Sequence, residues 1–309
     1  MQDILGIIFS VEFGYAVLRV STPILFAAMG ALLSDKAGVI NIALEGIMLI
    51  AALAGVIFSA LAQSALIGLF CAALAGSLAG MLLAYFALNL KTDVILSAIA
   101  LNLMASGGTV FIMFLIAGDK GISSSLPSKV LPKLTLPFIR DIPVLGSILS
   151  GHNVLTYGAV LSVFLVWFLL NKTPLGLHIR AVGENPDAAD SVGISVRRTQ
   201  YIALTLSGLM AGFGGAYMSM GYVSWFSTNM TAGRGFIALA AEAMGGATPF
   251  GALLTSMLFG FFDALSNSLH SLSIPVEFVQ MVPYASTVIG LVIYAVNRTN
   301  RMKRIQVRP

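Results

Sequence analysis

Residues 65–90 read ALIGLFCAALAGSLAGMLLAYFALNL, a run of 26 residues without a charged side chain. A helix needs about 20 mostly apolar residues to cross the hydrocarbon core of a bilayer. The same rule marks further candidate spans at residues 15–34, 39–61, 94–117, 155–170, 201–223 and 279–296. The sequence therefore predicts an all-α, polytopic membrane protein.

The composition of the whole chain agrees with these spans. Of its 309 residues, 58% are hydrophobic and only 10% are charged, whereas a soluble domain carries about 25% charged residues. Such a composition excludes disordered proteins, coiled coils and nucleic-acid-binding proteins. One cysteine, Cys71, cannot form an intrachain disulfide, and the three histidines lack metal-ligand spacing, so we expect no metal site.

Residues 235–267 interrupt the series of single spans. They are apolar enough to be buried, but glycines and a proline lie inside the stretch, and both residue types break helices. We expect a hairpin of two short helices there, and about 8 to 10 transmembrane helices in a single domain that covers residues 1–309. The interrupting residues are Gly245, Gly246, Pro249 and Gly251.

The distribution of Lys and Arg between the spans predicts the orientation of the chain. Cytoplasmic connections of membrane proteins carry an excess of basic residues. One set of connections holds 11 Lys and Arg residues, and the opposite set holds five, among them Arg234. We therefore expect a cytoplasmic carboxyl terminus, a cytoplasmic segment at residues 172–200 and an external loop at residues 118–153.

The segment 172–200 is the most polar stretch of the chain and contains the signals of a short helix. Asn185 is a good N-cap, Pro186 suits the first helical position, and Gly193 ends the helix. We expect a helix over residues 186–192 that docks in a groove of a cytoplasmic partner, with a plain connecting loop as the alternative. Its apolar side consists of Ala188, Ala189 and Val192.

Residues 180–196 read RAVGENPDAADSVGISV and follow TPLG at 173–176. This stretch resembles the coupling segment of ABC-importer permeases of the branched-chain amino acid and simple-sugar type. Residues 36–46, KAGVINIALEG, resemble the nucleoside branch of that family, and so do residues 234–254, RGFIALAAEAMGGATPFGALL. The chain is thus similar to this family over most of its length.

The resemblance implies that the chain is a permease subunit that imports nucleosides or a related small polar solute across the cell membrane, and is not itself an enzyme. The implied partners are a second permease subunit in a homodimer or heterodimer, a cytoplasmic ABC ATPase and an external substrate-binding protein or lipoprotein. The chain lacks the phosphate loop G-x-x-x-x-G-K-[ST], so we expect ATP and Mg²⁺ on the ATPase. The residues expected to couple to the ATPase are Gly183, Glu184, Asn185, Pro186, Ala188, Ala189 and Gly193.

Two glutamates, Glu45 and Glu242, fall in membrane-embedded stretches. A charge at membrane depth costs about 2.5 to 3.5 kcal/mol on insertion scales, so it usually has a function or a partner. Asn41 lies four residues before Glu45, and would share its helical face, while Asn102 is a polar residue of the span 94–117. We expect all four residues to line the solute pathway, with hydrogen bonding between helices as the alternative for Asn102.

The segments 38–45 and 235–242 match in Gly, Ile, Ala and Glu at identical offsets. An internal repeat would explain the match, and transporters often bind solute where repeats meet. Chance similarity between Ala- and Gly-rich stretches is the other explanation. The two glutamates also leave open a second function, a proton-coupled secondary transporter in which Glu45 and Glu242 carry protons.

Overall fold

The computed structural model describes residues 10–135, 145–221 and 223–269, and the isolated positions 285, 288, 290, 292 and 296. Its long helices are α2 (Val11–Asp35), α3 (Leu44–Ala62), α4 (Ala65–Ala84), α5 (Val94–Ala117), α8 (Val154–Lys172), α11 (Val196–Met220) and α13 (Pro249–Leu269). The short elements are the π-helix η1 (Tyr85–Asn89), α7 (Leu145–Leu149), α9 (Pro174–Glu184), α10 (Pro186–Ser191) and α12 (Arg234–Met244).

Within the described residues, seven helices are long and apolar enough to cross a membrane. The protein is therefore an all-α, multi-pass membrane protein, as predicted. The expected span at 279–296 lies outside the described residues, apart from single positions. The break after α12 is confirmed, but the second arm of the expected hairpin, α13, is one of the seven long helices. Pro249 begins α13 instead of interrupting it, because proline is tolerated at the first position of a helix.

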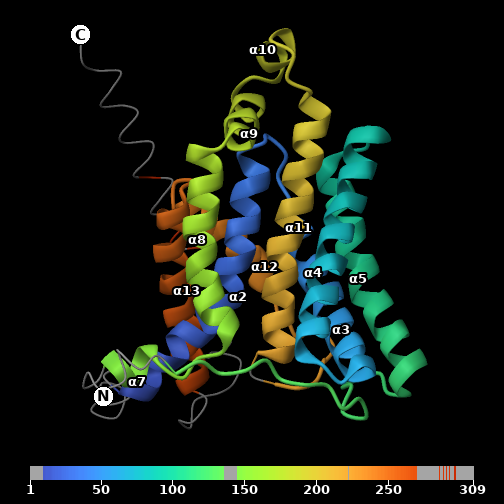
Figure 1. Cartoon of the computed structure of the whole chain (residues 1–309), viewed down its shortest axis with the longest axis vertical. Coiled ribbons are helices and arrows are strands. Elements are labelled where there is room, and N and C mark those ends of the chain that lie inside the picture. Colours follow the sequence, from blue (N-terminus) through green and yellow to red (C-terminus); the bar gives the residue numbers. More distant parts are fainter. Residues whose placement is uncertain are drawn as a thin grey trace.

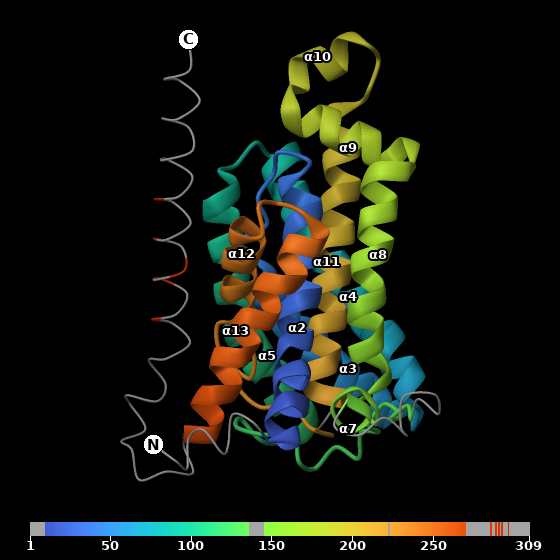
Figure 2. The same cartoon turned by 90° about the vertical axis from the view of Figure 1, so that its left-hand side faces the viewer.

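The helices form one bundle around α2 and α11 (Figure 1). In this view α8 and α13 lie on one side of the central pair, and α3, α4 and α5 lie on the other. Figure 2 shows that α9 and α10 project from one end of the bundle, and that α7 lies at the opposite end. We call these the α10 end and the α7 end.

The α4–α11 contact is a glycine seam in which the two backbones touch. A Cβ atom at Gly76 would clash with the carbonyl oxygen of Gly208, and a Cβ atom at Gly80 would clash with that of Leu204. Small residues at such positions let membrane helices approach closely enough for van der Waals packing. The seam therefore gives the bundle a rigid centre beside α2.

Residues 118–135 and 145–153 form an irregular cover at the α7 end. Isolated bridges pair Ile122 with Ser227 and Lys133 with Asn153. The Asn153 amide also donates to the carbonyl oxygens of Leu131 and Gly221, both at 2.9 Å. The described residues of this segment are irregular apart from the short helix α7, and hydrogen bonds tie them to the bundle.

Candidate functional site

Two interrupted helices begin inside the bundle and meet there. The non-helical loop 36–43 follows α2, and the side-chain amide of Asn41 donates to Ser207 Oγ at 2.9 Å. Ser207 lies near the middle of α11, so the loop reaches the middle of the bundle before α3 begins at Leu44. Residues 223–233 are likewise non-helical, and α12 begins after them at Arg234.

Glu45 connects the two helix starts. Its carboxylate accepts hydrogen bonds from the backbone N–H groups of Gly233, at 2.8 Å, and Gly235, at 2.7 Å. The N-cap of α12 is Gly233 with φ +80°, which has no side chain to satisfy these donors. Glu45 also lies in the first turn of α3, so the positive ends of two helix dipoles face its charge. The carboxylate is therefore stabilised by this chain alone.

Asn102 of α5 caps the start of α3. Its side-chain oxygen accepts from Gly46 N at 2.8 Å, and its amide donates to the carbonyl oxygen of Ile42 at 3.0 Å. The N-cap residue of α3, Ala43, supplies no side-chain hydrogen bond of its own. Asn102 thus makes the interhelical hydrogen bonds that were the alternative to a place in the solute pathway.

Asn41 is fully buried and fixes the loop before α3. Its side-chain oxygen accepts from Ala43 N at 3.0 Å, and its backbone N–H donates to Ser34 Oγ at 3.3 Å. The prediction that Asn41 and Glu45 share a helical face is wrong, because α3 begins only at Leu44. Their side chains instead bond to different elements, α11 and α12.

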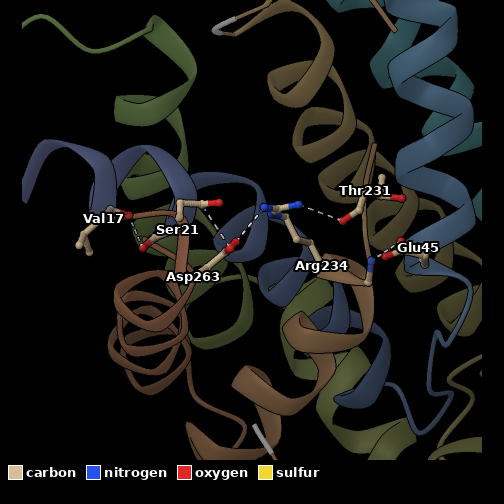
Figure 3. A network of polar contacts seen from close by, with 8 residues as sticks. Val17, Ser21, Glu45, Thr231, Arg234 and Asp263 are labelled. Carbon is tan, nitrogen blue, oxygen red and sulfur yellow. Dashed lines mark hydrogen bonds and ion pairs between the residues drawn. The ribbon is translucent and has the colours of Figure 1, made fainter. Parts of the chain in front are cut away.

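A partly buried ion pair holds α12 from its other side (Figure 3). Arg234 Nη2 lies 2.8 Å from the carboxylate of Asp263 in α13, and the two side chains are 17% and 12% exposed. Arg234 is therefore part of the bundle, which corrects its assignment to an external connection. The sequence analysis did not identify Asp263, although it is a carboxylate within the apolar run FGFFDAL, as Glu45 is a carboxylate within an apolar stretch. We call Asn41, Glu45, Asn102, Arg234 and Asp263 the polar junction.

Glu242 lies near the end of α12, away from the polar junction. Its side chain is buried, at 6% exposure, and its Oε1 atom has no hydrogen-bond partner among the described residues. When residues 38–45 are aligned with residues 235–242, most of the first stretch is a loop, whereas the second is entirely helical. These two stretches are therefore not copies of one structural unit. Instead they touch each other, at Glu45 and Gly235.

The α10 end contains the segment predicted to couple to an ATPase. Asn185 Oδ1 accepts from Ala188 N at 3.0 Å and Gly193 has φ +84°, which confirms both end signals of the short helix. Ala189 is only 4% exposed and packs within this chain, whereas Val192 is 75% exposed. The expected docking face is thus reduced to Ala188 and Val192. The predicted residues Glu184, Asn185, Pro186 and Ala188 are exposed, as is Gly193.

The sequence analysis missed α9, which precedes α10. Thr173 Oγ1 accepts from Gly176 N at 3.1 Å and Pro174 follows, so the same cap signals that predicted α10 were present. At the end of α9, Gly183 packs directly on the loop 36–43, where a Cβ atom would clash with the Lys36 carbonyl oxygen. A groove of about 650 Å³ lies between α9 and this loop, and its charged lining residues are Asp35, Lys36, Arg180 and Glu184.

Comparisons with known proteins show which transport proteins this chain resembles. Residues 15–297 match the family described as branched-chain amino acid transport system / permease component. The guanosine ABC transporter permease protein NupQ of Bacillus subtilis is 38% identical over 289 residues, 89% of each chain. The nucleoside ABC transporter permease protein NupC of Lactococcus lactis is 36% identical over 89% of each chain. A putative glucose ABC transporter permease, TsgC13 of Haloferax volcanii, is 32% identical over 85% of this chain and 79% of its own. No solved structure matches.

Proposed function

Because this chain belongs to the family of branched-chain amino acid transport system permease components, we propose that it is the membrane permease of an ATP-driven importer for nucleosides or a related small polar solute. The nucleoside relatives support the solute class. The observation that carries the proposal is the meeting of two helix starts inside the bundle at Glu45. Interrupted helices with polar groups at their ends are typical of solute sites in transporters.

The solute pathway follows the face on which α12 and α3 begin. Non-helical backbone at membrane depth is tolerated only where protein covers it or water lines it. Ala232 is exposed and Phe236 is 48% exposed on either side of the Glu45 contact, so this face is suited to a second permease subunit and an aqueous path between the two. Glu45 and Asn102 are half-buried and can reach the path, while the buried Asn41 and Glu242 act by positioning helices.

In this proposal the α10 end faces the cytoplasm and binds the ABC ATPase. The carboxyl terminus lies on the same side of the membrane. Exposed Ala188 and Val192 provide an apolar contact beside the charged groove under α9. The loop 118–153 then faces outward, toward a substrate-binding protein or lipoprotein. We expect Ala188→Asp to prevent co-purification of the ATPase, because the new carboxylate would be buried unpaired in the interface. Gln63→Asp, at an exposed position at the α7 end of the bundle, is the control.

Uptake of labelled guanosine and uridine by cells that carry the importer tests the function. We expect uptake to stop when the ATPase gene is deleted and to continue when a protonophore is added. The opposite pattern would show the proton-coupled secondary transporter. Glu45 argues against that alternative, because both of its oxygens already accept backbone hydrogen bonds and a proton would remove one acceptor.

A further inference from the structure

The loop 36–43 contacts the ATPase-facing segment at one end and the solute-facing helices at the other. At its start, Gly183 of α9 packs on Lys36, and Gly38 adopts φ +74°, with its Cβ position 3.3 Å from Gly183 Cα. Gln200 near the start of α11 donates to the Ala37 carbonyl oxygen at 3.3 Å. The backbones of α9 and the loop are therefore in direct contact at this point, with no side chain between them.

The far end of the same loop is held by hydrogen bonds to α11, α2 and α5. Asn41 bonds to Ser207 and Ser34, and Asn102 bonds to Ile42 and Gly46. The next polar side chain is Glu45, one residue into α3. Through its two hydrogen bonds the start of α12 is attached to the start of α3. The Glu45 carboxylate thus connects α3, which continues the loop, to the start of α12.

We propose that Glu45 is a positioning residue for transport: its carboxylate ties α12 to the loop that α9 contacts, so that movement of α9 reaches the solute-facing helix. This inference rests on the proposed function, since it assigns the movement of α9 to the ATPase. In this proposal Glu45 acts through its hydrogen bonds to Gly233 and Gly235, one on each carboxylate oxygen, and not as a solute ligand. Both helix dipoles favour a charged group at this place.

The test measures nucleoside uptake and ATP hydrolysis in the same proteoliposomes, reconstituted with the complete complex. Glu45→Gln keeps the shape but leaves one oxygen for two N–H donors. We expect the ATP hydrolysed per nucleoside imported to rise about fivefold, as loss of one hydrogen bond would give, with the KM for the nucleoside unchanged. The control is Glu12→Gln, the same change at an exposed position of α2, which should leave the ratio unchanged. If Glu45→Gln does not assemble, Glu45→Asp keeps the charge, moves it back from α12, and serves the same comparison.

A double-variant cycle then shows whether Gly183 and Glu45 act on the same structural connection or affect transport independently. Gly183→Ala places a methyl group against the other end of the loop and should also raise the ATP hydrolysed per nucleoside imported. The double variant of Gly183→Ala with Glu45→Gln should show no higher ratio than the more affected single variant. A raised KM with an unchanged ratio would show that Glu45 binds solute and would overturn the proposal, as would multiplicative effects. Failure of the wild-type complex to couple hydrolysis to uptake would instead reject the proposed function.

Discussion

Glu45 and Glu242 have matching sequence surroundings and opposite structural situations. Each stands seven residues after a glycine, in segments with the pattern Gly-x-Ile-x-x-Ala-x-Glu. Glu45 lies at a helix start and accepts two backbone hydrogen bonds, whereas Glu242 lies near a helix end with one oxygen unpartnered among the described residues. The difference shows that the position of a carboxylate relative to its helix end, which the pattern does not fix, decides how its charge is accommodated.

The largest expected effect comes from the ion pair beside Glu45. Asp263→Leu leaves the Arg234 guanidinium without its carboxylate inside the bundle. Breaking a buried pair costs about 3 to 5 kcal/mol, and the lower end of this range applies to this partly buried pair. We expect a loss of this size in the free energy of unfolding, measured by denaturation in mixed micelles. The double variant Arg234→Met with Asp263→Leu should recover most of it, because no unpaired charge remains. A double variant as unstable as Asp263→Leu would contradict this account.

Removing the Glu45 carboxylate should be the next most damaging change. Glu45→Ala leaves the N–H groups of Gly233 and Gly235 without acceptors, and a hydrogen bond to a charged group contributes about 1.5 to 3 kcal/mol. We expect a destabilisation of about 3 kcal/mol in the same unfolding measurement. Glu12→Ala, at an exposed position of α2, is the matched control and should cost less than about 0.5 kcal/mol.

Glu242 should respond in the opposite way. Glu242→Leu replaces a buried, partly unpartnered carboxyl by an apolar group, and such exchanges are often neutral or stabilising. We expect no loss of stability beyond about 1 kcal/mol, together with slower uptake at equal membrane levels if Glu242 positions α12 for transport. Wild-type uptake in both Glu242→Leu and Glu242→Gln would show that Glu242 does not position α12 for transport.

The smallest expected effect is a pH dependence of stability caused by His152, a buried base outside the spanning helices. His152 stacks on Tyr15 with ring centroids 3.8 Å apart, and burial lowers its pKa below the ordinary value of 6.5. Above that pH the imidazole is neutral in both folded and unfolded protein. As the pH falls below 6.5, the unfolded state takes up a proton first, so stability should decline until the folded-state pKa is reached. Thermal unfolding across this range should show the decline, and His152→Gln should reduce it.

Local signals explain what the sequence predicted well. Long uncharged runs predicted the spans, and the Asn185, Pro186 and Gly193 signals predicted α10, because each depends on neighbouring residues only. The start of α3 was misplaced because Asn102 and Ser207, on other helices, decide where the loop ends. The apolar surroundings of Glu45 drew attention to its carboxylate, but its hydrogen-bond partner Gly233 lies 188 residues away in the sequence. Every residue except proline has a backbone N–H group, so the sequence cannot show which of them donates to Glu45.

The glycine seam between α4 and α11 has a consequence for how this protein can diversify. Where two backbones touch, every side chain larger than a hydrogen atom must push the helices apart, so Gly76, Gly80 and Gly208 leave no room for gradual change. The face around Ala232 and Phe236 is open and accepts side chains of different sizes. Side chains on that open face can therefore vary in size without moving the helices, whereas any substitution in the seam displaces both α4 and α11.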